Sequence, residues 1–68
     1  ILRRGMSGAD VKTLQAALTA YGYSCGSAGA DGDFGAGTEA ALKQFQTAYK
    51  LGADGIAGKG TWGKLLGV

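Results

Sequence analysis

The sequence predicts one all-α domain, a compact three-helix bundle with two structured Asp-Gly loops. Two observations support this fold class. Apolar side chains recur at helical spacing in three segments, and an Asp-Gly stretch precedes each of the last two segments. The chain has only 68 residues, near the lower limit for independent folding, so the helices must share one core. We therefore treat residues 1–68 as a single domain, and the absence of an initial Met suggests that it was excised from a longer protein.

The two Asp-Gly stretches are similar in sequence. Residues 31–38 read Asp-Gly-Asp-Phe-Gly-Ala-Gly-Thr, and residues 54–61, which follow by 23 positions, read Asp-Gly-Ile-Ala-Gly-Lys-Gly-Thr. Asp-Gly forms turns because Asp bonds the downstream backbone and Gly tolerates positive φ. A glycine at the N-cap and a threonine in the first turn follow in each copy: Gly35 and Thr38, then Gly58 and Thr61. The pattern predicts two similar loops that each start a helix, with ligand contact as a second use.

The first helix is predicted from Gly8 to Tyr21. Its apolar stripe is Val11, Leu14, Leu18 and Tyr21. Its polar positions Lys12, Gln15 and Thr19 are expected to face away from this stripe or to lie on its edge.

Both ends of the first helix have capping signals. Ser7 followed by Asp10 resembles a capping box, with Ser7 as the N-cap. Gly22 is suited to the C′ position that ends a helix.

The second helix is predicted from Ala36 to Tyr49 and the third from Lys59 to Leu66. Glu39 and Lys43 form a favourable i,i+4 pair on the second helix. Gly37 should weaken the start of that helix by about 1 kcal/mol relative to alanine. The expected core consists of Val11, Leu14, Leu18, Tyr21, Phe34, Ala41, Phe45, Leu51, Ile56, Trp62 and Leu65.

Composition excludes several functions. The net charge is only +2 and no basic block extends beyond Arg3-Arg4, so nucleic-acid binding has little support. No apolar run approaches the length of a membrane span, about 20 residues. Cys25 is the only cysteine and histidine is absent, which excludes an intrachain disulfide, Cys-His and Ser-His-Asp catalysis and histidine-containing zinc sites. Cys25 is expected to be a small, partly buried apolar residue.

The sequence also lacks the residue patterns of a calcium loop, of a phosphate-binding loop and of a carboxylate-based active site. A calcium loop that starts at Asp31 would place Gly35, Ala36 and Leu42 where an oxygen ligand, a glycine and a bidentate Glu are required. Phosphate-binding glycine motifs are incomplete, and a chain this short offers little material for the cleft that paired catalytic carboxylates need. We predict no catalytic residue, no metal and no cofactor.

Binding is better supported than catalysis. Aromatic residues lie close to the polar loops: Tyr23, Phe34, Tyr49 and Trp62. Such rings beside Asp, Thr and Gln side chains would form a shallow site, although a tryptophan in a short final helix, such as Trp62, more often fills the core than serves as a stacking platform.

The motifs together resemble the peptidoglycan-binding-like domain. The matching features, in the family's order, are Gly5-Met6-Ser7-Gly8-Ala9-Asp10-Val11 with Leu14-Gln15, then Gly22-Tyr23, Asp31-Gly32-Asp33-Phe34-Gly35 with Thr38, Phe45-Gln46, Leu51, Asp54-Gly55-Ile56 with Gly58, and Thr61-Trp62 with Leu65. The resemblance covers nearly the whole chain. The departures are Ala57, where the family often has a bulkier residue, and the loop from Ser24 to Ala30.

This resemblance implies a non-catalytic, monomeric module that binds bacterial peptidoglycan. It would target an attached cell-wall hydrolase (an amidase, muramidase, lytic transglycosylase or phage endolysin) in the extracellular space, periplasm or cell wall. The ligand-binding residues it suggests are Tyr23, Asp31, Phe34, Thr38, Gln46, Asp54, Thr61 and Trp62. We expect a shallow groove where Tyr23, Phe34 and the two loops meet.

An alternative is a protein-interaction or regulatory pro-segment. A similar fold occurs in the pro-segments of matrix metalloproteinases, whose inhibitory cysteine lies in a Pro-Arg-Cys-Gly type of motif. Here the context is Tyr23-Ser24-Cys25-Gly26 and the chain has no proline, so this alternative is weaker.

Overall fold

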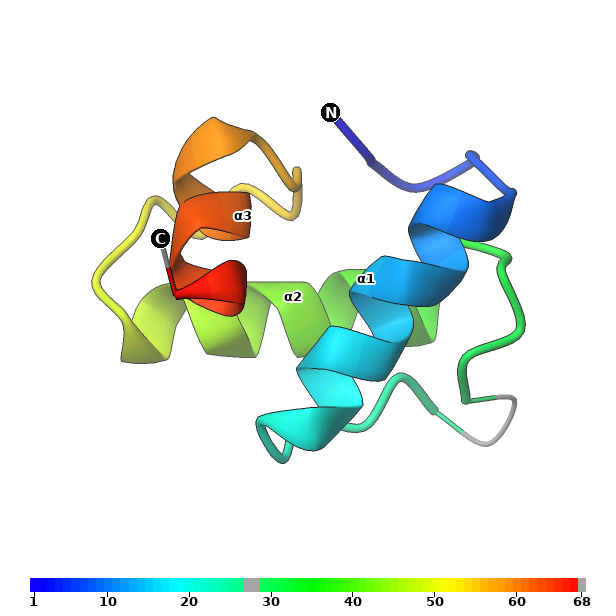
Figure 1. The fold of residues 1–68 in the computed structure, drawn as a ribbon, viewed down its shortest axis with the longest axis horizontal. Coiled ribbons are helices and arrows are strands. Elements are labelled where there is room, and N and C mark those ends of the chain that lie inside the picture. Colours follow the sequence, from blue (N-terminus) through cyan, green and yellow to red (C-terminus); the bar gives the residue numbers. More distant parts are fainter. Residues whose placement is uncertain (27–28, 68) are drawn as a thin grey trace.

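The computed structural model describes residues 1–26 and 29–67 and contains three helices (Figure 1). They are α1 (Ala9–Ala20), α2 (Ala36–Ala48) and α3 (Lys59–Leu66). Each helix was predicted, and no boundary differs by more than one residue. The predicted all-α, three-helix fold class is confirmed.

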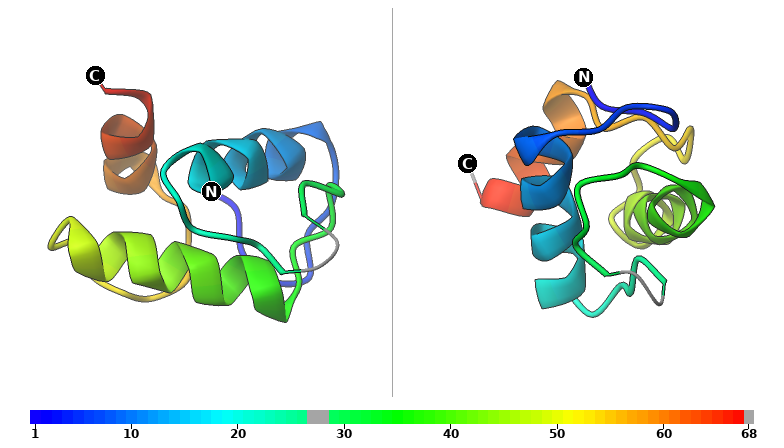
Figure 2. Two further views of the ribbon diagram at one scale, coloured as in Figure 1. Left: turned by 90° about the horizontal axis from the view of Figure 1, so that it is seen from below. Right: turned by 90° about the vertical axis from the view of Figure 1, so that its right-hand side faces the viewer.

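Helix α2 is the base of the molecule, and α1 and α3 both lie on one side of it (Figures 1 and 2). Two connecting loops join these helices: residues 21–35 between α1 and α2, and residues 49–58 between α2 and α3. Each loop ends in one of the Asp-Gly stretches, so each Asp-Gly stretch leads directly into a helix. Gly35 and Gly58 are the N-caps of α2 and α3, as predicted.

The core lies between the three helices. Its buried apolar side chains are Leu2, Val11, Leu14, Leu18, Cys25, Phe34, Ala41, Leu42, Phe45, Ala57 and Leu65. Four residues expected in the core are less buried: Tyr21 is 40% exposed, while Leu51, Ile56 and Trp62 are half-buried. Helical periodicity missed Leu2 and Ala57 because neither belongs to a helix. Cys25, expected to be a small, partly buried apolar residue, is fully part of the buried core.

The N-terminal segment, residues 1–8, joins both Asp-Gly loops. Leu2 pairs with Ala57 through two backbone hydrogen bonds, of 3.2 and 2.8 Å. Further along, the Gly8 amide donates to the Gly32 carbonyl (2.9 Å), and Ser7 forms an antiparallel bridge with Asp33. The first loop and the second loop are thus held by the same short segment.

The predicted capping box at the start of α1 is wrong. Gly8, at φ +132°, is the N-cap, and no side chain caps the helix. Ser7 is one position too early because its backbone belongs to the bridge with Asp33.

Helices α1 and α2 end in the same backbone motif. In α1 the Gly22 amide bonds the Thr19 carbonyl and the Tyr23 amide bonds the Leu18 carbonyl, at 2.9 Å each. This is a Schellman motif with Gly22 at φ +95°, and it confirms the prediction that Gly22 ends the helix. In α2 the corresponding left-handed residue is Lys50, at φ +59°.

Candidate functional site

A buried glutamine holds the first Asp-Gly loop. The Gln15 Nε2 group lies within hydrogen-bond distance of Asp31 Oδ1 (3.1 Å), the Asp33 carbonyl (3.0 Å) and Thr38 Oγ1 (2.8 Å). Gln15 Oε1 accepts a bond from the Gly32 amide at 2.8 Å. We call this network the first glutamine clasp. It links α1, the loop and the first turn of α2.

A second glutamine clasp repeats this arrangement between α2 and α3. Gln46 Nε2 lies 3.1 Å from Asp54 Oδ1, 3.0 Å from the Ile56 carbonyl and 3.2 Å from Thr61 Oγ1. Gln46 Oε1 accepts a 3.0 Å bond from the Gly55 amide. Each partner occupies the same position relative to its Asp-Gly pair as in the first clasp. The internal repeat is therefore a repeat of a hydrogen-bond network as well as of sequence.

Gln15, expected to face away from the apolar stripe of α1 or to lie on its edge, faces the interior of the domain. Its side chain is completely buried, and Gln46 is buried as well. Burial of an amide is stable when both of its ends are hydrogen-bonded, as they are here. Among the described residues, no buried side-chain nitrogen or oxygen lacks a partner. The signal that sequence reasoning missed is a glutamine preceded by a large apolar residue and followed by an Asp-Gly-…-Thr stretch, which occurs twice.

The clasp aspartates are ionised at neutral pH. The Asp31 carboxylate accepts a 2.9 Å bond from the Asp33 amide, and this bond, with that from Gln15, holds the pKa of Asp31 below its ordinary value. The Ile56 amide, and then Gln46, likewise lower the pKa of Asp54. Both aspartates are exposed, so they also present negative charge to solvent.

The eight predicted site residues lie in separate parts of the fold. Thr38, Gln46 and Thr61 are buried inside the clasps, and Phe34 is buried in the core. Asp31 and Asp54 are the exposed members of the clasps, Trp62 is half-buried against the core, and Tyr23 lies beside Phe45. Phe34, expected beside Tyr23 and the two loops in a shallow groove, is only 1% exposed and faces inward, and no enclosed pocket is found among the described residues. Contact between any of the eight residues and a ligand stays a prediction.

Three tyrosines form a cluster around the ring of Phe45, and we call Tyr21, Tyr23 and Tyr49 the tyrosine patch. Their ring centroids lie 5.4, 6.0 and 4.5 Å from that of Phe45, respectively. Tyr21 and Tyr49 also meet edge to face at 5.9 Å. Sequence reasoning singled out Tyr23 and Tyr49 as aromatics near the loops, but it placed Tyr21 in the core.

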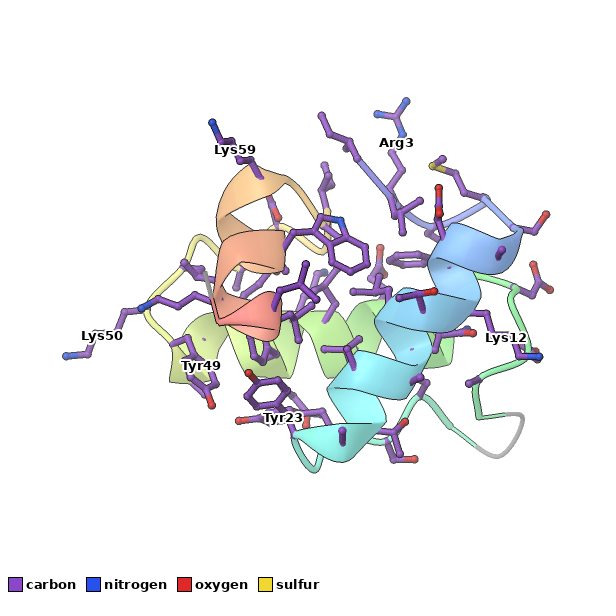
Figure 3. All side chains as sticks on the ribbon, in the orientation of Figure 1. Arg3, Lys12, Tyr23, Tyr49, Lys50 and Lys59 are labelled. Carbon is purple, nitrogen blue, oxygen red and sulfur yellow. The ribbon has the colours of Figure 1, made fainter. Side chains whose placement is uncertain are left out.

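The tyrosine patch lies where the three helices end. Tyr21 and Tyr49 are the C-caps of α1 and α2. The Tyr21 hydroxyl donates to the carbonyls of Lys64 (3.2 Å) and Leu65 (3.0 Å) in the last turn of α3. Figure 3 shows Tyr23 and Tyr49 at this end of the molecule, with Lys50 projecting beyond them.

Catalytic and metal-binding arrangements are not found among the described residues. No group of three or more Cys, Asp or Glu side chains is placed to hold a metal ion in residues 1–26 and 29–67. Burial raises the pKa of the Cys25 thiol, so this cysteine is not activated as a nucleophile. Within the same ranges, no helix is long and apolar enough to span a bilayer.

These features define a small helical binding module in which most of the polar signature residues are used for internal architecture. The chain belongs to the family described as "Putative peptidoglycan binding domain", whose model matches residues 7–65. Membership of a binding-domain family places the chain among non-catalytic modules.

The chain is also similar to parts of individual proteins and to a solved structure. The chain is 47% identical to part of the type VI secretion system spike protein VgrG3 of Vibrio cholerae, over 87% of this chain and 7% of that protein. It is 44% identical to part of the zinc D-Ala-D-Ala carboxypeptidase of Streptomyces albus G, over 94% of this chain and 25% of that protein. The crystal structure of the SleB N-terminal domain superimposes with a TM-score of 0.90 at 42% identity, covering 97% of this chain and 88% of that one. The chain therefore spans a quarter or less of the two curated relatives.

Proposed function

We propose that this domain binds bacterial peptidoglycan without altering it and thereby brings an attached cell-wall hydrolase to its substrate. The observation that carries the proposal is the family match, which covers almost the whole chain. The relatives support the proposal that the domain serves an attached enzyme, because a similar module forms only a minor part of proteins such as a D-Ala-D-Ala carboxypeptidase. The attached enzyme would be an amidase, muramidase, lytic transglycosylase or phage endolysin, acting outside the cytoplasm or in the cell wall.

Modest affinity is sufficient for this role. A module tethered to an enzyme raises the local concentration of that enzyme on an insoluble polymer, and the gain depends on the tether as well as on the dissociation constant. A monomeric domain with an open, rigid surface would meet this requirement.

Burial divides the predicted ligand contacts into two groups. Asp31, Asp54, Tyr23 and Trp62 are exposed or half-exposed and remain candidates for direct contact. The other four, Phe34, Thr38, Gln46 and Thr61, are at most 5% exposed, so we assign them to building the loops.

Sedimentation with purified sacculi tests the proposal. The isolated domain should be recovered with the pellet in proportion to the amount of sacculi, and its addition to a hydrolase catalytic domain should increase release of soluble wall fragments. A small, basic, globular protein of similar net charge serves as the control for non-specific adsorption. A folded domain that remains in the supernatant with walls of every chemotype would contradict the proposal.

A further inference from the structure

We propose that the tyrosine patch, with Lys50 and Lys64 at its edge, is the surface that contacts peptidoglycan. The tyrosine rings pack against the sugars of the glycan strand and the two lysines bind carboxylates of the stem peptides. This inference rests on the proposed function and assigns it to a surface different from the Asp-Gly loops.

Exposure combined with fixed geometry is the first argument. Tyr21 and Tyr49 are 40% and 39% exposed although both contact the buried ring of Phe45. Tyr49 lies on Phe45 with a 4.5 Å centroid separation, and the Tyr21 hydroxyl is bonded to the end of α3. Rings held in this way lose little conformational entropy when they meet a ligand.

The chemistry of tyrosine suits a sugar polymer. A tyrosine side chain presents an apolar ring together with a hydroxyl group. Pyranose rings have the complementary character, with apolar C–H faces and a polar rim. Tyr21 and Tyr49, whose rings meet edge to face, and Tyr23, which packs on the same Phe45 ring, therefore offer apolar surface against which sugar C–H faces can pack.

Charge supplies the second argument. Lys50 follows Tyr49 directly, and the Lys64 carbonyl accepts the Tyr21 hydroxyl, so both lysine backbones border the patch. Both side chains are exposed. The stem peptides of peptidoglycan carry free carboxylates, which are complementary to these two cations.

The acidic residues of the domain lie in other places. Asp10 and Glu39 are in the first turns of α1 and α2, whereas the tyrosine patch is at the last turns. The remaining three, Asp31, Asp33 and Asp54, lie in the Asp-Gly loops, where Asp31 and Asp54 are engaged by glutamines. The nearest acidic residue in sequence to a patch tyrosine is Asp54, and its carboxylate accepts bonds from the Ile56 amide and from Gln46.

Chemical-shift mapping on the unaltered domain is the first test, because it requires no substitution. Titration with stem-free glycan oligosaccharides should shift amide signals of residues 19–23, 45–51 and 64–66. Titration with stem peptides alone should shift signals near Lys50 and Lys64 more weakly. Shifts confined to residues 31–34 and 54–58 would place the site on the Asp-Gly loops and overturn the inference.

Matched variants give the second test. Tyr49→Ala should weaken sacculus binding about tenfold, the loss typical of a central interface aromatic, while Lys50→Gln should weaken it less and reduce its salt dependence. Ile1→Ala is the control, since Ile1 is an exposed apolar residue (82%) outside the patch. Thermal unfolding would confirm that each variant is folded.

The two proposals fail in different ways. If the unaltered domain does not sediment with sacculi, the proposed function is wrong. If it sediments and Tyr49→Ala sediments equally well, the function stands and the tyrosine patch is not the binding surface.

Discussion

Gln15 and Gln46 are the residues on which both loops depend. Each places its amide nitrogen among three oxygens and its amide oxygen against a glycine N–H. No other neutral side chain of this length has a donor and an acceptor at the same terminus. A glutamate would match the shape while removing both hydrogens and adding a negative charge beside an aspartate.

We therefore predict that Gln15→Glu and Gln46→Glu each lower the free energy of unfolding by about 3 kcal/mol at neutral pH, because a buried charge is left facing oxygen atoms. Gln44→Glu is the matched control, since Gln44 is exposed on α2 and should change stability by less than about 0.5 kcal/mol. Urea unfolding followed by circular dichroism measures all three. Equal effects at Gln15 and Gln44 would contradict the role of the clasp.

Lys50 is a residue whose backbone conformation favours glycine. It has the left-handed φ of +59° at the end of α2, where α1 has Gly22. Replacing Lys50 with glycine removes the steric cost of that conformation, so Lys50→Gly should raise the free energy of unfolding by about 0.5–1 kcal/mol.

Gly22→Ala is the reciprocal control and should lower stability by about 1 kcal/mol, because it introduces a side chain at φ +95°. Thermal and urea unfolding of the two variants provide the comparison. A destabilised Lys50→Gly variant would show that the lysine side chain contributes more than its backbone conformation costs.

Helices α2 and α3 start with equivalent residues but have different surroundings. Gly37 and Gly60 are both the second residue of their helix and both precede the clasp threonine. A Cβ atom on Gly37 would overlap with the Cys25 carbonyl, whereas a Cβ on Gly60 would meet no atom within 4 Å. The longer first loop is folded back against α2 at this point, which explains why a glycine that weakens the helix is present there.

Alanine at these two equivalent positions should have opposite effects. Gly60→Ala should stabilise the domain by about 0.5–1 kcal/mol through higher helix propensity. Gly37→Ala should destabilise it by at least about 1 kcal/mol, because the Cys25 backbone must move despite the same gain in propensity. Denaturant titration of both variants checks the sign, and a stabilised Gly37→Ala would show that the loop moves aside at little cost.

The whole molecule is held together by contacts that join its three helices through the two Asp-Gly loops. The domain has a radius of gyration of only 10.2 Å, so its core is small. The two glutamine clasps and the N-terminal segment connect the helices through the loops, and Leu2 adds a buried side chain next to the second loop. Because each clasp contains an ionised aspartate, stability is linked to pH.

The direction of this linkage follows from the pKa values. The pKa values of Asp31 and Asp54 are lower in the folded domain than in the unfolded chain. Their contribution to stability is therefore fully present above the unfolded value, about 3.9, and is lost as the pH falls through the lower folded values. Urea midpoints measured from pH 7 to pH 2 should be constant at first and then decrease below about pH 4.

The double variant Asp31→Asn, Asp54→Asn provides the control for this prediction. It should be less stable at neutral pH and should show a smaller decrease in acid, because two of the titrating groups are gone. An unchanged pH profile in this variant would assign the acid sensitivity to other carboxylates.

Much of the fold was predictable because its signals are local. Apolar spacing identified three helices, and glycines at 22, 35 and 58 marked where helices end or begin. Thr38 and Thr61 were correctly placed in first turns. Their partners were not predicted, because Gln15 is 23 residues from Thr38 and polar residues on a helix are ordinarily assigned to the solvent side.

The sequence by itself determined the three helices, the two similar loops and the membership of a binding-domain family. Only the tertiary structure decided which polar residues are internal, that Leu2 pairs with Ala57, and that three tyrosines meet around Phe45 at the helix ends. The physical reason is the range of the interactions. Helix propensity and capping act over a few neighbouring residues, whereas burial and hydrogen bonding of a side chain depend on segments that meet only after the chain has folded.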